Sequence, residues 1–215
     1  MLFLDLRAGR RHVRSLCEAR PGLSVLNLFA YTCGVGVAAA SARAAEVWNV
    51  DFATSALAVG ERNATLNGLL GHRIRFEHGD AFLMARQLAG LPVKGRRGKL
   101  PRFEPVSPRT FDLVVLDPPK WAKSPFGVVD LVRDYQSVFK PALLATRPGG
   151  HMLVTNNVAR VDADDWLDVL RRCVEKNGRV VEELRLIPPD EDFPTSDGQP
   201  PLKMAALRLG AVSSA

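Results

Sequence analysis

The chain has 215 residues, of which 47% are hydrophobic and 24% charged. This composition suits one folded domain with a full core and argues against a disordered chain. No apolar run is long enough to span a bilayer and no charged-then-apolar leader opens the chain, so we expect a cytoplasmic protein. The three cysteines form no Cys-x-x-Cys pair and the four histidines show no metal spacing, so we expect neither a disulfide framework nor a metal site. We interpret residues 1–215 as a single domain.

The formal charge is +6 at pH 7, and the basic residues gather in two places. One is a lead-in over residues 1–22 and the other is a Gly/Pro-rich loop over residues 92–108. They contain Arg7, Arg10, Arg11 and Arg14 in the lead-in and Lys94, Arg96, Arg97, Lys99 and Arg102 in the loop. A polyanion such as RNA is a natural partner for such surfaces. A basic surface with no partner is the alternative, and charge alone does not decide between them.

Predicted strands and helices alternate along most of the chain. In chain order, the patterns predict a strand over residues 24–30, a helix over 33–45, a strand over 46–51, a helix over 53–66, a strand over 73–78, a helix over 81–88, a strand over 111–116, a helix over 129–146, a strand over 151–155, a helix over 162–176, and strands over 180–187 and 202–209. This order predicts an α/β fold with a mostly parallel seven-stranded sheet. The last two strands predict a C-terminal hairpin whose final strand is antiparallel.

Ligands of an open parallel sheet bind beyond the carboxyl ends of its strands, and polar residues follow several of these strands. Gly34 and Gly36 follow the first strand and allow a ligand to approach the backbone where a helix begins. Asp51 ends the second strand 17 residues after Gly34, near the usual spacing for a carboxylate that accepts ribose hydroxyls. Phe52 is placed to pack on an adenine face, and Asp80 to accept from the adenine amino group.

The glycine loop by itself fits two cofactors. Gly34-x-Gly36-x-x-Ala39 formally matches the dinucleotide pattern of NAD enzymes. An NAD site needs no counterpart of Asp80, however, and Asp117-Pro118-Pro119 after the fourth strand has no obvious role in hydride transfer. Both features fit S-adenosylmethionine, because Asp117 is placed to hold a cationic amino group or a substrate donor.

Several segments resemble the Rossmann-like, S-adenosylmethionine-dependent methyltransferases that modify large-subunit ribosomal RNA. They are Phe3-Leu4-Asp5-Leu6-Arg7, Val25-Leu26-Asn27-Leu28-Phe29-Ala30-Tyr31-Thr32, Asn63-Ala64-x-x-Asn67-Gly68, Phe111-Asp112 through Asp117-Pro118-Pro119-Lys120, and Gly149-Gly150 through Asn157. The resemblance covers nearly the whole chain and implies the methyltransferase fold, S-adenosylmethionine as cofactor and ribosomal RNA as substrate.

The same resemblance implies roles for individual residues. It places Tyr31, Thr32, Gly34 and Gly36 in the cofactor loop, Asp51 at the ribose, Asp80 at the adenine, and Asp117, Pro118 and Pro119 between the methyl donor and the target base. We add Phe29, Phe52, Ala81 and Asp117 to the cofactor-binding set and expect Lys120, Trp121, Asn156 and Asn157 to contact the substrate. Cys33 stands where the family usually has glycine. Many relatives carry RNA-binding domains ahead of this one, so we expect either a short form or a late start.

Two branches of this family differ in their chemistry. Methylation of cytosine C5 uses a cysteine thiolate in the segment after the fifth strand, where this chain has Asn156-Asn157. The branch that methylates guanine N7 carries asparagines there, and N7 needs neither a general base nor a protein nucleophile. We therefore favour guanine N7, with Asn156 or Asn157 at the base edge and Trp121 or Tyr135 stacked on a flipped base. An exocyclic amine stays possible, because Asp117 and the Pro118 carbonyl can accept its N–H groups.

Other interpretations remain open at this point. Asp51 and Asp80 can be helix caps, and Asn156 and Asn157 ordinary turn residues. At the level of function, the alternatives are a cytosine-C5 methyltransferase, a small-molecule or protein methyltransferase, and an RNA-binding relative that has lost catalysis.

Overall fold

The computed structural model describes residues 2–69, 71, 73–94, 103–124, 127–193, 195 and 200–211. Within them, seven strands form one sheet in the order β3-β2-β1-β4-β7-β9-β8, and β5 pairs with β6 in a separate hairpin. The strands are β1 (Ser24–Leu28), β2 (Glu46–Asp51), β3 (Arg73–His78), β4 (Phe111–Leu116), β5 (Trp121–Ser124), β6 (Gly127–Asp130), β7 (Thr146–Asn156), β8 (Val181–Ile187) and β9 (Lys203–Leu209). The helices are α1 (Arg7–Ala19), α2 (Gly34–Ser41), α3 (Thr54–Leu66), α4 (Ala81–Leu88), α5 (Tyr135–Leu144) and α6 (Ala163–Lys176).

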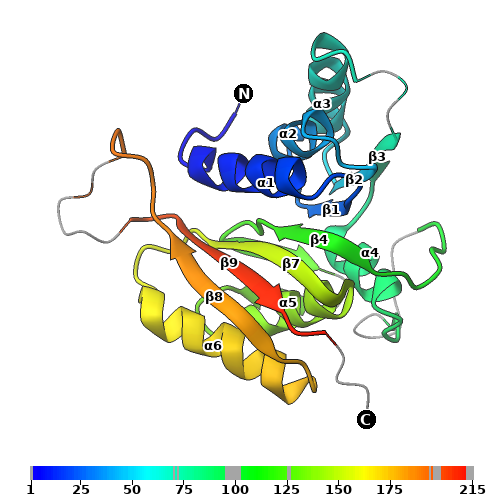
Figure 1. Cartoon of the computed structure of the whole chain (residues 1–215). Coiled ribbons are helices and arrows are strands. Elements are labelled where there is room, and N and C mark those ends of the chain that lie inside the picture. Colours follow the sequence, from blue (N-terminus) through cyan, green and yellow to red (C-terminus); the bar gives the residue numbers. More distant parts are fainter. Residues whose placement is uncertain are drawn as a thin grey trace.

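The sheet confirms the predicted α/β class. Strands β1, β2, β3, β4 and β7 run parallel, and β9 is antiparallel to both β7 and β8. From β1 the chain moves outward through β2 to β3 and then returns to place β4 on the other side of β1 (Figure 1). Ligands of open α/β sheets bind at such a reversal of strand order, so the carboxyl ends of β1 and β4 mark the expected site.

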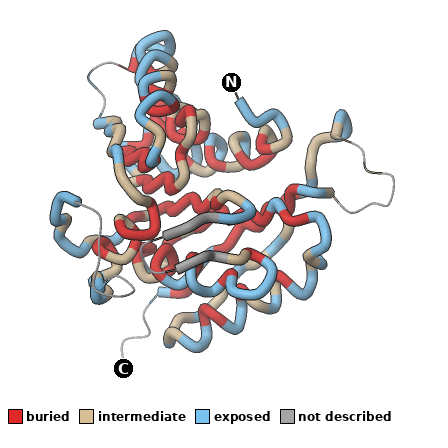
Figure 2. The backbone as a smooth tube through the Cα atoms, turned by 180° about the vertical axis from the view of Figure 1, so that it is seen from behind, coloured by how far each residue is buried: buried red, intermediate tan, exposed pale blue. Residues whose placement is uncertain are grey.

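Helices cover both faces of the sheet. One face packs against α1, α2 and α3, and the other against α4, α5 and α6 (Figure 1). Strand β4 shows why: Val114 and Leu116 join the core beneath α4–α6, whereas Leu113 and Val115 join the core beneath α1–α3. Such apolar strands are typical of a sheet buried on both faces, and the central strands are buried almost throughout (Figure 2).

The basic lead-in of the sequence is a helix. Helix α1 buries Ala8, Gly9, Val13 and Cys17 against the sheet and leaves its four arginines at least partly exposed. Gly9 is needed for this packing, because a Cβ there would lie 3.1 Å from the sulfur of Met204 on β9. The arginine-rich composition hid an amphipathic pattern at helical spacing.

The largest errors in the predicted boundaries are in two elements. The helix predicted over residues 129–146 begins at Tyr135, and the preceding segment forms the β5–β6 hairpin. Strand β7 begins at Thr146 and includes Pro148-Gly149-Gly150, which were expected to end a helix. A register shift between Phe111 and Leu113 of β4 accommodates the extra residues, and Gly149 has a φ of 72° that favours glycine.

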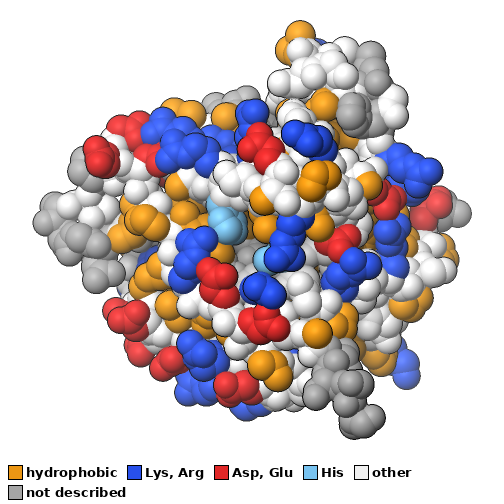
Figure 3. Space-filling model, in the orientation of Figure 1, with side chains coloured by type: hydrophobic (Ala, Val, Ile, Leu, Met, Phe, Trp, Pro, Cys, Tyr) orange, Lys and Arg blue, Asp and Glu red, His pale blue; other side chains and the backbone are white. Residues whose placement is uncertain are grey.

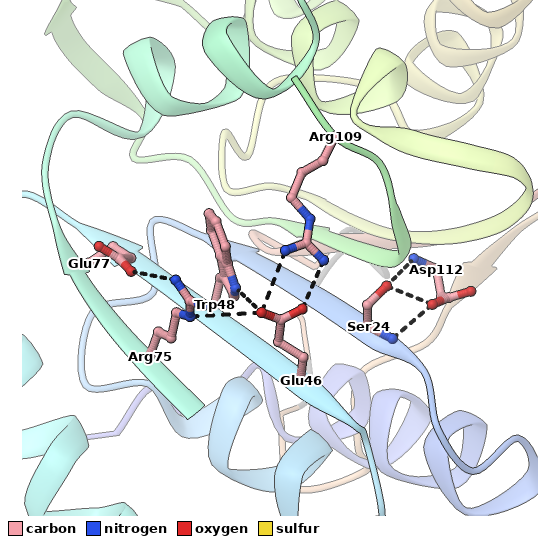
Figure 4. A network of polar contacts seen from close by, with 7 residues as sticks. All are labelled: Ser24, Glu46, Trp48, Arg75, Glu77, Arg109 and Asp112. Carbon is pink, nitrogen blue, oxygen red and sulfur yellow. Dashed lines mark hydrogen bonds and ion pairs between the residues drawn. The ribbon is translucent and has the colours of Figure 1, made fainter. Parts of the chain in front are cut away.

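A polar network joins the strands at the end of the sheet opposite the expected site (Figure 4). Glu46 at the start of β2 accepts from Arg109 at 2.8 Å and from the Trp48 indole at 2.7 Å. The guanidinium carbons of Arg75 and Arg109 lie 4.7 and 5.0 Å from the Trp48 ring centre. Because the network sits at the amino ends of the strands, we assign it to stability rather than to ligand binding.

Candidate active site

The carboxyl ends of β1, β2 and β4 open into a cavity of about 400 Å³. A second cavity of about 410 Å³ shares Phe29, Phe52 and Pro119 with the first. The first is lined by nine of the predicted site residues, Phe29, Tyr31, Asp51, Phe52, Asp117, Pro118, Pro119, Lys120 and Asn157. The second adds Asp80, Ala81 and Trp121. Twelve of the predicted site residues thus line two adjoining cavities, each of a size suited to a small-molecule ligand.

The loop after β1 has an unusual backbone. Phe29, Tyr31 and Cys33 have φ values of 59°, 48° and 59°, in the left-handed region that residues other than glycine rarely adopt. Hydrogen bonds hold the loop in place: the Ala30 amide donates to Val50 at 3.0 Å and the Tyr31 amide to Asp51 at 2.8 Å. Strain of this kind persists where the surroundings impose it, and it is concentrated at ligand sites.

Asp51 connects this loop to the end of β2. One carboxylate oxygen accepts from Tyr31 and the other accepts from the Ala53 amide at 2.9 Å. Each oxygen has a second lone pair, so Asp51 can still accept ribose hydroxyls. The residue thus both shapes the loop and offers acceptors to a ligand.

Asp80 is the N-cap of α4. Its Oδ1 accepts from the amides of Phe82 at 2.8 Å and Leu83 at 3.1 Å. Burial raises the pKa of Asp80 and outweighs these two hydrogen bonds, which lower it. The cap and the cofactor interpretations are compatible, because Asp80 also lines the second cavity beside Ala81.

The two glycines of the loop have different uses. Gly34 lies at the start of α2 and borders a recess that also contains Thr32 and Asp117. Gly36 is buried, and a Cβ there would lie 1.9 Å from Oδ1 of Asn49. The structure thus explains Gly36 by packing of α2 on β2, and not by approach of a ligand.

Cys33, which stands where the resemblance implies a glycine, fits because Gly60 of α3 has no side chain. A Cβ on Gly60 would lie 2.4 Å from the Cys33 sulfur. Burial raises the pKa of the Cys33 thiol to about 12, and that of Cys17 to about 11. All three cysteines are buried and none lines either cavity.

Asp117 sits at the centre of the site. The Thr155 hydroxyl donates to its Oδ1, and the buried Tyr135 hydroxyl donates to the Thr155 carbonyl at 2.8 Å. Burial raises the pKa of Asp117 to about 6, the Thr155 hydrogen bond opposes that rise, and the nearby Asp5 charge adds to it. A carboxyl so perturbed within a cavity is typical of a functional site.

The residues expected at the substrate divide into two groups. Lys120, Trp121 and Asn157 are exposed at the cavities. Asn156 is fully buried, where its Oδ1 accepts from the Val158 amide at 3.0 Å. The structure therefore brings Asn157, and not Asn156, to the site. Tyr135 is also buried, packed against Trp166, so it cannot stack on a flipped base.

The expectation of a basic N-terminal surface needs correction. Arg7 and Arg11 form ion pairs with Asp190, Arg7 also pairs with Asp192, and Arg14 pairs with Glu18. Arg7 and Arg11 thus tie α1 to the β8–β9 connection, whereas Arg14 is paired within α1 itself. The face drawn in Figure 3 likewise mixes basic and acidic side chains instead of separating them by sign. Of the basic loop, Arg96, Arg97, Lys99 and Arg102 lie outside the described residues.

Sequence reasoning missed one part of the site. Phe3, Asp5 and Leu6 line the 400 Å³ cavity, and the Phe3 ring centre lies 5.0 Å from that of Tyr31. The signal was the segment Phe3–Arg7, which resembles the family but was given no role. Within the part of the chain that the structure describes, no cluster of His, Cys, Asp or Glu could hold a metal ion and no helix could cross a membrane.

Comparison with known proteins identifies the family of the chain. A family model of S-adenosylmethionine-dependent methyltransferases matches residues 1–208. Ribosomal RNA large subunit methyltransferase I of Aeromonas hydrophila is 30% identical over 198 residues, covering 92% of this chain and 45% of the relative. Ribosomal RNA large subunit methyltransferase K/L of Allochromatium vinosum is 33% identical over 165 residues, covering 76% of this chain and 20% of the relative. The chain thus spans less than half the length of these relatives.

Solved structures share the fold. The crystal structure of SMU.776, complexed with SAH, superposes with a TM-score of 0.74 at 22% identity over 96% of this chain and 50% of that one. The SAM-dependent methyltransferase from Agrobacterium tumefaciens superposes with a TM-score of 0.72 at 23% identity over 96% of this chain and 63% of that one.

Proposed function

Since the chain belongs to the S-adenosylmethionine-dependent methyltransferase family, we propose that it methylates a base of large-subunit ribosomal RNA, and that the base atom is guanine N7. The cavity fits the cofactor. Asp51 offers acceptors for ribose hydroxyls, Phe52 exposes an aromatic face for the adenine, and Asp80 lies in the adjoining cavity. Phe29 and Tyr31 of the strained loop after β1 line the same cavity as Asp51 and Phe52.

The observation that carries the choice of atom is the absence of a thiol from the site. Cytosine C5 needs a cysteine nucleophile, and all three cysteines of this chain are buried away from both cavities. S-adenosylmethionine would supply the methyl group as an electrophile. N7 would supply the electron pair of the new bond, and the sulfur would keep the pair of the broken methyl–sulfur bond and leave as S-adenosylhomocysteine. The protein then has to position the base and exclude water.

The cavity rim suits a guanine held in this way. The ammonium of Lys120 and the amide of Asn157 are donors, and the N7 edge of guanine presents the O6 acceptor beside N7. The exposed face of Trp121 suits stacking with a flipped base. Asp117 and the Pro118 carbonyl are acceptors, so an exocyclic amine is the second candidate target.

The proposal that ribosomal RNA is the substrate rests on the names of the relatives, which specify large-subunit ribosomal RNA. The basic loop over residues 92–108 supports the same choice by charge. We propose RNA as the partner and the cytoplasm as the location on these grounds.

Transfer of labelled methyl groups tests this proposal. Wild-type protein with labelled S-adenosylmethionine should label ribosomal RNA, either deproteinised or in the large subunit, and should not label bulk protein. Asp117→Ala should lower the rate by about 100-fold or more, as is typical when a preorganised group of the reaction centre is removed. The matched control is Asp134→Ala, which alters an exposed aspartate whose side chain does not cap α5. Label in protein instead of RNA, or full activity of Asp117→Ala, would refute the proposal.

A further inference from the structure

The asparagine at the cavity rim lies in a short turn that leads from β7 to α6. Asn157 is exposed and lines the 400 Å³ cavity, whereas its neighbours Asn156 and Val158 are buried. Asn156 holds the turn from the side of β7: its Oδ1 accepts from the Val158 amide at 3.0 Å, and its NH₂ group donates to the Leu131 carbonyl at 3.4 Å. The position of Asn157 is therefore set by the buried residues on either side of it.

Lys203 holds the same turn from the side of β9. Strand β9 lies beside β7 in the sheet (Figure 1), and Lys203, its first residue, is paired with Asn156. The ammonium donates to the Val158 carbonyl at 3.0 Å and to the Pro200 carbonyl at 3.4 Å. The Val158 carbonyl also accepts from the Val161 amide at 3.1 Å. This carbonyl of the turn is thus bound by two donors, one of which is charged.

A gain in stability does not explain the burial of Lys203. The residue is 2% exposed, and within the described part of the chain its ammonium has only the two carbonyl partners. Burial lowers the pKa of Lys203, and the charge of Asp162 opposes that change. A buried ammonium without a carboxylate partner loses hydration energy, and an apolar side chain of similar volume is often at least as stable. A group that breaks the rules of stable packing in this way is typical of a functional site.

We propose that Lys203 is a positioning residue that fixes Asn157 for contact with the target base. The start of β9 reaches the site, because Leu202 lines the same cavity as Asn157. Lys203 itself lines neither cavity, so it acts through the turn and does not touch the base. A displacement of about 1 Å at such a contact can lower a rate by about 100-fold. This inference rests on the proposed function, because it assigns a residue to the substrate side of that reaction.

Steady-state methyl transfer to deproteinised large-subunit ribosomal RNA tests the assignment. Lys203→Met keeps most of the side-chain length and removes the charge and the donors, and it should lower kcat by about 10- to 100-fold. KM for the RNA should stay within about twofold of wild type, since phosphate contacts elsewhere dominate the affinity. Calorimetric affinity for S-adenosylhomocysteine should be unchanged. The thermal midpoint should not fall, because the variant loses a buried charge and Val158 keeps its bond from Val161.

A double variant with Asn157→Ala identifies the route of the effect. Asn157→Ala should itself lower kcat by about 10- to 100-fold, and Lys203→Met should then add less than about twofold, because both changes remove the same contact. Lys203→Gln keeps an N–H donor on a shorter side chain and should lose less of the rate than Lys203→Met, so the comparison does not depend on the folding of one variant. The matched control is Lys140→Met, which alters an exposed lysine of α5 outside both cavities and should leave kcat unchanged.

The outcomes separate this assignment from the proposed function. An unchanged kcat in Lys203→Met, or losses that add to those of Asn157→Ala, would overturn the role of Lys203 while the wild-type protein stays active. A loss of rate together with a lower thermal midpoint and weaker S-adenosylhomocysteine binding would also overturn it, because the role would then be structural only. A wild-type protein that transferred no methyl group to the RNA would overturn the proposed function, and the role of Lys203 with it.

Discussion

The ionised carboxylate of Asp117 is predicted to lower the stability of the folded chain. The pKa of its carboxyl rises from an ordinary 3.8 to about 6, chiefly because burial penalises the charged form. At pH values above both pKa values, this difference lowers the free energy of unfolding by about 3 kcal/mol. Asp117→Asn removes the charge, and its amide oxygen can still accept from Thr155. We therefore expect the variant to be more stable than wild type by about 2 kcal/mol at about pH 8, once a weaker, uncharged hydrogen bond is allowed for.

The direction of the pKa shift determines how the stability difference between wild type and Asp117→Asn changes with pH. Because the pKa is higher in the folded chain, protonation favours folding, and the penalty grows as the pH rises from about 4 to about 6. Urea unfolding of wild type and Asp117→Asn should show a gain of about 2 kcal/mol at about pH 8 and less than about 1 kcal/mol near pH 4. In thermal scans at the higher pH, the midpoint should rise by about 4–8 °C. A variant no more stable than wild type at about pH 8, or a gain independent of pH, would refute the reasoning.

Asp51→Asn is the matched control in the same cavity. Both oxygens of Asp51 accept from backbone amides, of Tyr31 and Ala53. An asparagine would direct an NH₂ group at one of these amides, so this variant should lose about 1–3 kcal/mol of stability. If Asp117→Asn raises the free energy of unfolding and Asp51→Asn lowers it, burial dominates the energetics of the Asp117 carboxylate and hydrogen bonding dominates those of Asp51.

Further predictions concern packing, the structural network and the basic loop. Gly60→Ala should lose about 1–3 kcal/mol, because its Cβ would lie 2.4 Å from the Cys33 sulfur, and the double variant with Cys33→Gly should recover most of that loss in urea unfolding. Glu46→Gln should lose about 1 kcal/mol at neutral pH. Burial raises the pKa of Glu46, but the Arg109 ion pair and the Trp48 hydrogen bond outweigh it and lower the pKa, so the difference should fade in unfolding measurements as the pH falls through the acid range. Neutral substitution of the loop cations should reduce the salt slope of RNA binding by up to about 4 in a filter-binding series, and an unchanged slope would remove the loop from the interface; the substituted residues are Lys94, Arg96, Arg97, Lys99 and Arg102.

The parallel sheet could be predicted from the sequence because its strands carry local signals. The unbroken apolar run of β4 and the polar or glycine residues that follow several of the strands indicate both the strands and the edge at which ligands bind. The final strand was correctly expected to be antiparallel. These features depend on residues close together in the chain, which is what pattern analysis detects.

Features that depend on distant contacts were not predictable in this way. The helix predicted over residues 129–146 overlaps the end of β6, whose strand conformation depends on pairing with β5. Asn156 and Asn157 look equivalent in sequence, and only the fold shows that one is buried and the other lines the cavity. Arg7 and Arg11 looked like a free basic surface because their partner Asp190 lies far along the chain.

Nucleoside mass spectrometry of ribosomal RNA labelled by the wild-type protein tests the central claim most directly. A site without a thiol, with donors from Lys120 and Asn157 at its rim, should yield labelled 7-methylguanosine as the single product. Labelled 5-methylcytidine would contradict the account, because it would require a cysteine to act from a position that the structure shows to be buried.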